Sequence, residues 1–227
     1  TTEVVKNIRE SYNLPLIVAV VALVARIGPV WGFGPDGQRP TPTPEQISQA
    51  RARVGWTKLT LDKANLTLAK QHDGLNLDLG SLLQGYAADR AAQLLRREGL
   101  EEFLIEVGGE ILAAGTWRVG LEDPFQPRLT METIVLTDRA LGVSGLYRAR
   151  KAAAGKPVSH ILSPKTGEPI VTTLELAAVF HPDCVQADAW STALMAVGFE
   201  AAKLLAERED LEVILVTPDK QVWRRAK

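Results

Sequence analysis

Apolar and polar positions in the first third of the chain predict an apolar segment and a short helix. The most apolar stretch is residues 16–25. It is too short to cross a bilayer as a helix, which takes about 20 residues. We therefore expect a buried core helix or strand there, and no transmembrane segment in this chain. Thr43, Pro44 and Gln46 have the spacing of a capping box with proline at the first helical position, which predicts a helix ending near Arg53.

Further along, strict alternation of apolar and polar residues predicts strands. Residues 56–61 and 65–70 are typical of a β-hairpin with its turn at 62–64, and residues 75–79 of a third strand. An apolar stripe at helical spacing predicts a helix that begins at Ser81 and stops before Gly99. We expect one long helix at 185–206 and further strands at 103–107, 110–114, 117–121, 132–137, 140–144, 174–180 and 211–217.

The order of these elements predicts the fold class. Strands and helices are interspersed without strict β–α–β alternation, which favours an α+β fold with a mixed or antiparallel sheet and packed helices. The 227 residues are enough to bury a sizeable core. Hydrophobic residues make up 46% of the chain and charged residues 23%, and these ordinary globular values exclude general disorder.

Charge and cysteine content narrow the classes of function. A net charge of -1 argues against a nucleic-acid partner, which needs a clustered basic excess. The single cysteine, Cys184, excludes an intramolecular disulfide and a cysteine-rich zinc site. With three histidines in the chain, a hard ion on oxygen ligands is the favoured metal chemistry.

Two segments combine a helix with groups that suit phosphate or a divalent cation. In residues 77–90 a strand, Gly80 and a helix N-terminus follow one another, and such a terminus suits an anionic phosphate. The alternative is an ordinary joint in which Gly85 is a packing glycine. In residues 186–198 Asp188 and Thr192 lie four apart on one helix face, where a carboxylate and a hydroxyl suit Mg²⁺. The alternative is that Asp188 caps its helix and Thr192 is a small core residue.

Two other segments offer a base and flexible backbone. His160 opens a short apolar run and is a plausible base at neutral pH; the alternative is a histidine at a strand edge that bonds a backbone carbonyl. We expect His181 to be structural and Cys184 to pack as a small apolar residue. The glycine pair at 108–109 and the glycines of 142–147 permit positive φ and close contact with a flat ligand, although plain turns use the same residues.

Taken together and in this order, the segments resemble the ApbE family of FAD:protein FMN transferases. WGFGP at 31–35 also resembles a family segment. Because the segments are collinear over roughly residues 30 to 200, the match is far more specific than any single one. The segments that carry it are LDLGSLLQGYAAD (77–89), GGE (108–110), WRVGLEDP (117–124), VSGLY (143–147), HILSPKTG (160–167) and ADAWSTA (187–193).

The resemblance implies an activity and a set of site residues. Such enzymes bind FAD with Mg²⁺, attach its FMN to a Thr or Ser hydroxyl of an acceptor flavoprotein and release AMP, and the resemblance implies the periplasmic side of the cell envelope. It assigns the metal to Asp188, Thr192 and the carbonyl of Ser81, and the base to His160. It assigns the flavin nucleotide pocket to Gly80, Gln84, Gly108, Gly109, Gly145, Tyr147, His160 and Ile161.

The chain also departs from the family pattern. Gln84 stands where the family has lysine, Ser81 where it has glycine, and Leu146 where it has an acidic residue. We expect residues 1–227 to form a single ApbE-like domain that lacks the family's N-terminal segment. Two alternatives to flavin transfer stay open at this point. One is a non-catalytic FAD-binding protein, and the other is an FAD pyrophosphatase that yields FMN and AMP.

Overall fold

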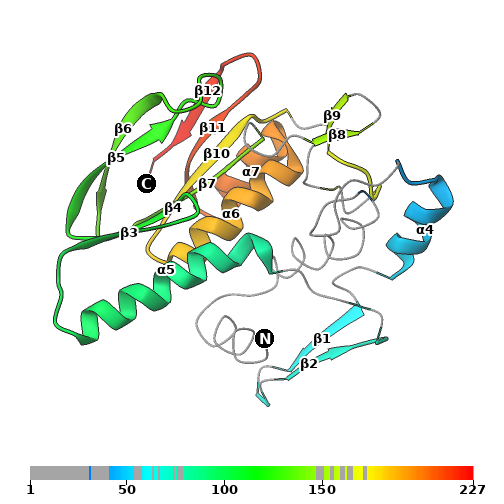
Figure 1. Ribbon diagram of the computed structural model, residues 1–227, viewed down its shortest axis with the longest axis horizontal. Helices are drawn as coiled ribbons and strands as arrows, with labels where there is room; N and C mark the ends of the chain where they lie inside the picture. Colours follow the sequence, from blue (N-terminus) through cyan, green and yellow to red (C-terminus); the bar gives the residue numbers. More distant parts are fainter. Residues whose placement is uncertain are drawn as a thin grey trace. The chain divides into compact units, whose positions relative to one another are not determined.

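The computed structural model forms two compact units, Thr1–Leu79 with Arg150–Val171 and Gly80–Ala149 with Thr172–Lys227 (Figure 1). Among the described residues, no helix is long and apolar enough to cross a membrane. The apolar segment 16–25 lies outside those residues. The structure describes residues 31, 41–53, 58–62, 64–65, 67–73, 75, 79–146, 151–153, 156–158, 162, 166–170 and 173–226.

The first unit contains the predicted short helix and hairpin. Helix α4 (Pro44–Ala52) begins with the expected capping box: the Thr43 hydroxyl accepts from the Gln46 N–H, and the Gln46 side chain accepts from the Thr43 N–H. Strands β1 (Leu59–Asp62) and β2 (Thr67–Lys70) pair antiparallel. Their turn comes later than predicted because the Asp62 carboxylate accepts two backbone N–H groups beyond the first strand.

Two details of this unit differ from the sequence prediction. A small hairpin, β8 (Lys151–Ala153) with β9 (Lys156–Val158), was not foreseen. The strand expected at 75–79 is not seen at its two ends, where Leu75 and Leu79 are outside any strand; residues 76–78 lie outside the described part of the chain.

The second unit is built on one antiparallel sheet. Helix α5 (Gly80–Arg97) precedes it, as predicted. Every neighbouring pair of strands described in the sheet is antiparallel, which confirms the α+β expectation and selects the antiparallel form. Within the described residues the sheet has six strands, in the order β12 (Val222–Arg225), β11 (Glu212–Val216), β10 (Leu176–His181), β7 (Ala140–Gly145), β4 (Glu110–Ala114) and β3 (Phe103–Val107). Of these, β12 was not predicted.

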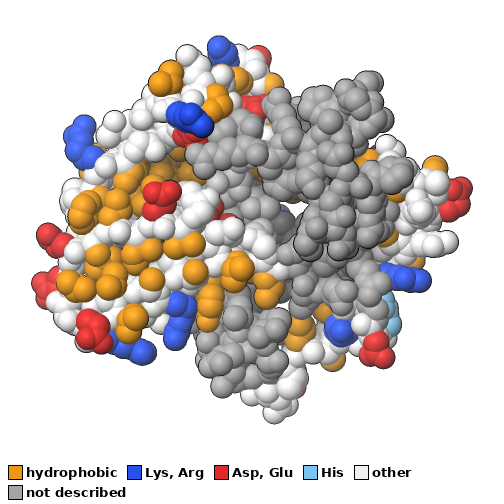
Figure 2. Space-filling model, in the orientation of Figure 1, with side chains coloured by type: hydrophobic (Ala, Val, Ile, Leu, Met, Phe, Trp, Pro, Cys, Tyr) orange, Lys and Arg blue, Asp and Glu red, His pale blue; other side chains and the backbone are white. Residues whose placement is uncertain are grey.

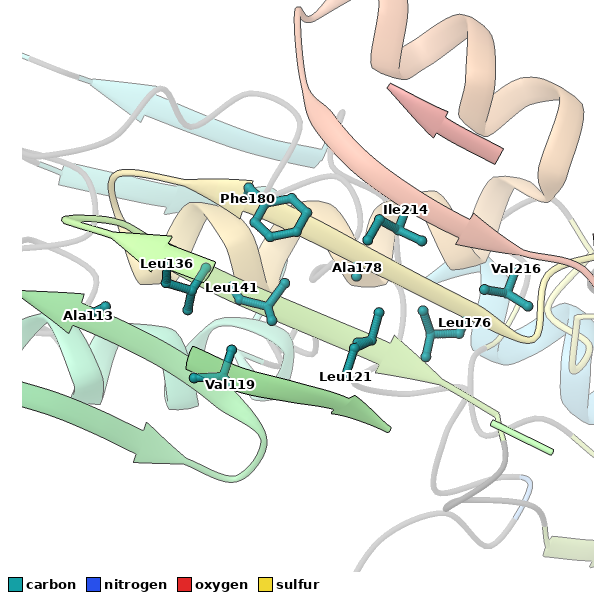
Figure 3. Close-up of a cluster of buried hydrophobic side chains, with 10 residues drawn as sticks. All are labelled: Ala113, Val119, Leu121, Leu136, Leu141, Leu176, Ala178, Phe180, Ile214 and Val216. Atoms are coloured by element: carbon teal, nitrogen blue, oxygen red, sulfur yellow. The ribbon is translucent and has the colours of Figure 1, made fainter. Parts of the chain in front are cut away.

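The two faces of this sheet carry different layers. The hairpin of β5 (Thr116–Glu122) and β6 (Thr130–Thr137) covers one face and encloses an apolar core with it (Figure 3). Helices α5 and α6 (Cys184–Val197) cover the other face. Alternation along each strand sends successive side chains to opposite layers. The core on the hairpin side comprises Ala113, Val119, Leu121, Leu136, Leu141, Leu176, Ala178, Phe180, Ile214 and Val216.

The outer side of the β5–β6 hairpin is mixed in character. Arg118 of β5 and Val135 of β6, which pair directly, are exposed on this side. Figure 2 shows hydrophobic side chains interspersed with charged ones over this region. The hairpin therefore buries one set of alternating positions and leaves the other to solvent, as expected of an antiparallel pair on a surface.

The long helix expected at 185–206 is two helices. Helix α6 ends at Val197, and α7 (Phe199–Arg208) begins after Gly198. Gly198 has a φ of 79°, which breaks the helical path, and the hydroxyl of Thr173 accepts the Phe199 N–H at 2.8 Å. The prediction of one helix was wrong because the apolar pattern is continuous across a break that a distant threonine stabilises.

Candidate active site

Helices α5 and α6 approach each other at Gly85. A β-carbon at this position would lie 2.4 Å from the carbonyl oxygen of Cys184 and 2.7 Å from the Cα of Val185. No side chain fits there, so glycine is required for the two helices to touch backbone to backbone. Gly85 is therefore a packing glycine, and the element that it packs against is α6.

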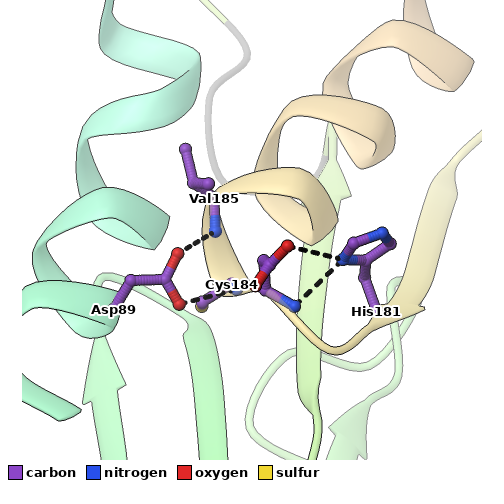
Figure 4. A network of polar contacts seen from close by, with 5 residues as sticks. Asp89, His181, Cys184 and Val185 are labelled. Atoms are coloured by element: carbon purple, nitrogen blue, oxygen red, sulfur yellow. Dashed lines mark hydrogen bonds and ion pairs between the residues drawn. The ribbon is translucent and has the colours of Figure 1, made fainter. Parts of the chain in front are cut away.

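Asp89 joins the same two helices one turn further along α5. Its carboxylate accepts the N–H groups of Cys184 (2.9 Å) and Val185 (3.0 Å), the first two residues of α6 (Figure 4). Asp183, the residue at the N-cap position, makes no side-chain capping bond. Asp89 thus caps a helix about 95 residues away in sequence. It was not identified from the sequence, because a cap that comes from another helix leaves no pattern among neighbouring residues.

Asp188 ties α6 back to α5. Its Oδ2 accepts the Gly85 N–H at 2.9 Å, and the contact is buried. In a regular α-helix that N–H is the donor for the carbonyl four residues earlier, which here is Ser81. In this structure the Asp188 carboxylate accepts it, which places that carboxylate against the N-terminal part of α5, the segment that contains Ser81. The alternative in which Asp188 caps its own helix is wrong, because it lies beyond the first residues of α6 and bonds α5.

The surroundings of Asp188 disfavour its charge. Burial, together with the nearby carboxylate of Glu110, raises the pKa of Asp188 to about 8, while the hydrogen bond from Gly85 acts in the opposite direction. Glu110 is itself buried, at 6% exposure, on the helix-facing side of β4. A cation placed beside these two carboxylates would relieve their repulsion. Glu110 lies in the GGE segment of the sequence but was not selected as a site residue.

The glycine pair at 108–109 forms the turn between β3 and β4. Val107 and Glu110 face each other across it, and the two glycines have φ values of 67° and 113°. Such angles are typical of a two-residue hairpin turn. A β-carbon on Gly108 would lie 2.9 Å from Cγ of Gln84. The pair is therefore a turn, as one interpretation held, and it also packs closely against the α5 side chain that replaces the family lysine.

Thr192 belongs to a cluster of three hydroxyls. Its Oγ1 lies 3.1 Å from Oγ of Ser144 in β7, and Ser144 Oγ lies 2.7 Å from Oγ of Ser191. Ser191 in turn donates to the backbone carbonyl of Asp188 at 2.8 Å. Thr192 is thus a hydrogen-bonded residue one helical turn after Asp188, and the interpretation of it as a simple core residue is wrong.

The other site residues predicted from the sequence fall into two groups. Gly80 is the first residue of α5, and Gly145 is the last of β7, opposite Leu176. Tyr147, His160 and Ile161 lie outside the described residues. The structure thus places Gln84 against Gly108, Asp188 against α5 at Gly85, and Thr192 against Ser144 of β7.

His181 and Cys184 have the structural roles expected of them. Nδ1 of His181 accepts the N–H of Asp183 at 2.9 Å, which shapes the turn into α6 (Figure 4). Cys184 is fully buried, and burial together with the carboxylates of Asp89, Asp188 and Glu110 raises the pKa of its thiol. A thiol in this state is neutral and unreactive.

The donor set fits a hard divalent cation. It comprises the Asp188 carboxylate, the Thr192 hydroxyl and the Ser81 carbonyl, all of them oxygen groups of the kind that Mg²⁺ accepts when phosphate and water complete its shell. Within the described residues, no group of three or more His, Cys, Asp and Glu side chains is placed to hold a metal ion. A site here would therefore combine one carboxylate with hydroxyl and backbone oxygens, and a substrate phosphate and water would complete it.

Comparison with known sequences points to one family. A model of the ApbE family matches residues 18–215. The FAD:protein FMN transferase of Salmonella typhimurium is 36% identical over 208 residues, which cover 86% of this chain and 59% of that protein. The enzyme of the same name from Escherichia coli is 35% identical over 212 residues, covering 87% and 60%. The chain spans about 60% of the length of these curated relatives.

Solved structures agree in fold over almost the whole chain. The flavin transferase ApbE from Vibrio cholerae superposes with a TM-score of 0.80 at 29% identity, covering 98% of this chain and 71% of that one. The apo form of the Pseudomonas stutzeri flavinyl transferase ApbE gives the same TM-score, identity and coverage. With a family model spanning most of its length and a shared fold, this chain belongs to the ApbE family.

Proposed function

We propose that this chain carries the flavin-transfer activity for which its relatives are named. The reaction moves the FMN part of FAD to a Thr or Ser hydroxyl of an acceptor flavoprotein, depends on Mg²⁺ and releases AMP. The observation that carries the proposal is the buried hydrogen bond from the Gly85 N–H to Asp188, which brings that carboxylate to the N-terminal part of α5, with Thr192 one turn beyond Asp188 in α6. The names of the relatives support the same reaction.

In this proposal the ion is held by Asp188, Thr192 and the carbonyl of Ser81. When bound, Mg²⁺ neutralises charge on the pyrophosphate oxygens of FAD. The N-terminus of α5 presents backbone N–H groups and partial positive charge to the same phosphates, starting at Gly80. The remaining pocket residues are those that the family resemblance assigns, namely Gln84, Gly108, Gly109, Gly145, Tyr147 and Ile161.

The proposed chemistry is a substitution at phosphorus. The acceptor hydroxyl oxygen forms a bond to the phosphorus of the FMN phosphate, and the bond from that phosphorus to the oxygen bridging to AMP breaks. AMP leaves with that oxygen, and His160 receives the proton of the acceptor hydroxyl. The assignment of His160 rests on the family resemblance. Residues 1–227 would serve this reaction as one domain.

A flavinylation assay tests the proposal. The protein is incubated with FAD, Mg²⁺ and an acceptor flavoprotein fragment; covalent flavin is read as fluorescence of the acceptor in a denaturing gel, and AMP by chromatography. We expect labelled acceptor and an equal amount of AMP. Asp188→Asn should lower the rate about 100-fold or more, because it removes the charged ligand.

Asp183→Asn is the matched control, since Asp183 lies in the same segment but its carboxylate makes no capping bond to α6. Its rate should stay close to that of the unaltered protein. Three results would contradict the proposal. These are AMP with free FMN but no labelled acceptor, which indicates a pyrophosphatase; FAD retained without AMP release, which indicates a binding protein; and equal rates for Asp188→Asn and the unaltered protein.

A further inference from the structure

The three hydroxyls beside the proposed metal site form a chain that ends on a carbonyl. Ser191 Oγ donates to the Asp188 carbonyl oxygen at 2.8 Å, Ser144 Oγ is 2.7 Å from Ser191 Oγ, and Thr192 Oγ1 is 3.1 Å from Ser144 Oγ. Ser191 is fully buried. Each contact has hydrogen-bond length, so all the oxygens are engaged in one continuous path.

Counting protons fixes the direction of this path. A hydroxyl carries one proton and two lone pairs, and a carbonyl only accepts. The proton of Ser191 is therefore committed to the Asp188 carbonyl. The bond between the two serines then takes the proton of Ser144, and the bond between Ser144 and Thr192 takes the proton of Thr192. One assignment satisfies all three contacts, and in it Thr192 is the donor.

We propose that Ser144 and Ser191 are positioning residues that hold the Thr192 proton toward Ser144, so that the lone pairs of Thr192 Oγ1 stay free for a divalent cation. The inference rests on the proposed function, because it concerns the same metal site. A threonine whose proton rotated toward the ion would repel it, so the fixed direction prepares the ligand before the ion arrives.

The fold holds the chain in place from two sides. Ser144 is on the helix-facing side of β7, and Gly142 on the same strand lets the sheet approach α6: a β-carbon there would lie 2.3 Å from the carbonyl carbon of Ala187. Ser191 and Thr192 are consecutive residues of α6. Two rigid elements therefore set the distances between the hydroxyls, as a positioning role requires.

Binding of Mn²⁺, used in place of Mg²⁺, tests the inference without measuring activity. The free ion is followed by electron paramagnetic resonance during titration into the full chain in the presence of FAD. We expect Ser144→Ala to weaken Mn²⁺ binding about tenfold, because Thr192 loses its acceptor. Ser191→Ala should weaken it less, about threefold, because Ser144 still accepts from Thr192 but is no longer fixed in direction. Ser144→Thr, which keeps the hydroxyl, should restore binding.

Thr137→Val is the matched control, since it removes another hydroxyl pair, with Thr116, on the β5–β6 hairpin. It should leave Mn²⁺ affinity unchanged. If Asp188→Asn abolishes binding while Ser144→Ala does not weaken it, the inference is overturned and the metal site stands. If the unaltered protein binds no Mn²⁺, the proposed metal site and the inference about the hydroxyl chain are both overturned.

Neutron diffraction from deuterated crystals gives a reading that needs no variant. Deuterium on Thr192 Oγ1 and directed at Ser144 supports the inference. Deuterium on Ser144 directed at Thr192 overturns it, since the lone pairs of Thr192 would then be partly used.

Discussion

The two faces of the six-stranded sheet bury different kinds of side chain. On the hairpin side the buried cluster consists entirely of apolar side chains such as Leu136, Phe180 and Ile214. On the helix side the buried cluster is mostly alanine and other small residues, and the carboxylates of Asp89, Glu110 and Asp188 are buried beside it. Burying a large apolar side chain contributes about 1.5–3 kcal/mol, whereas burying a carboxylate costs several kcal/mol. Burial on the hairpin side stabilises the fold, and this stabilisation offsets the cost of holding polar groups in fixed positions on the helix side.

The largest expected loss of stability comes from a substitution in the apolar core on the hairpin side. Leu136→Ala empties a fully buried position in β6 and should lower the free energy of unfolding by about 3 kcal/mol. Urea denaturation followed by circular dichroism measures this loss. Mn²⁺ affinity of the folded protein should stay within about twofold of the unaltered value, because Leu136 lies on the far side of the sheet from Asp188. A tenfold loss of affinity would show that the two faces are not independent.

The next largest effect comes from a substitution at the closest contact between α5 and α6. Gly85→Ala places a β-carbon 2.4 Å from the Cys184 carbonyl oxygen, so α5 and α6 must move apart. We expect a loss of about 2 kcal/mol in the free energy of unfolding. Mn²⁺ affinity should fall at least about tenfold, because Asp188 loses its fixed place against α5.

Gly99→Ala is the control for this substitution. Gly99 has a φ of 83° and open space around it, so the change should cost about 1 kcal/mol through backbone strain alone. Metal affinity should not change. Equal losses of affinity in both variants would mean that general destabilisation, and not the helix contact, governs the site.

The smallest expected effect comes from comparing a buried hydrogen-bond acceptor on the helix side with an exposed one elsewhere. Asp89→Asn keeps the shape but turns an amide group toward one of the two N–H groups at the start of α6. A loss of about 1.5 kcal/mol in the free energy of unfolding is expected, because one buried donor loses its acceptor. Asp138→Asn, at an exposed acceptor of the Gly115 N–H, should cost about 0.5 kcal/mol or less. If the two losses are equal, burial does not set the strength of the cap.

Local signals in the sequence predicted most of the framework. The capping box of α4 and helix α5 are where the pattern places them, as are the strands of the main sheet to within two residues at each end, apart from the unpredicted β12. These features depend on residues a few positions apart, where spacing carries direct physical meaning. The collinear segments identified the family for the same reason, since each is short and self-contained.

What escaped prediction depends on residues far apart in sequence. Asp89 and the N–H groups that it caps are separated by 95 and 96 residues, and Gly85 and Asp188 by 103. The Ser144–Thr192 contact spans 48 residues, and Thr173 marks the break between α6 and α7 from 26 residues away. No local period encodes such pairs; they appear only once the sheet has brought the helices together.

The buried thiol of Cys184 follows from this arrangement and gives the molecule an internal reporter. It is the chain's only cysteine, and it lies under the Asp89 cap at the point where α5 meets α6. While the helices stay in contact, a thiol reagent cannot react with Cys184, because the thiol is buried and its raised pKa keeps it protonated. The rate at which such a reagent modifies the folded protein therefore measures how often the joint that holds the site comes open.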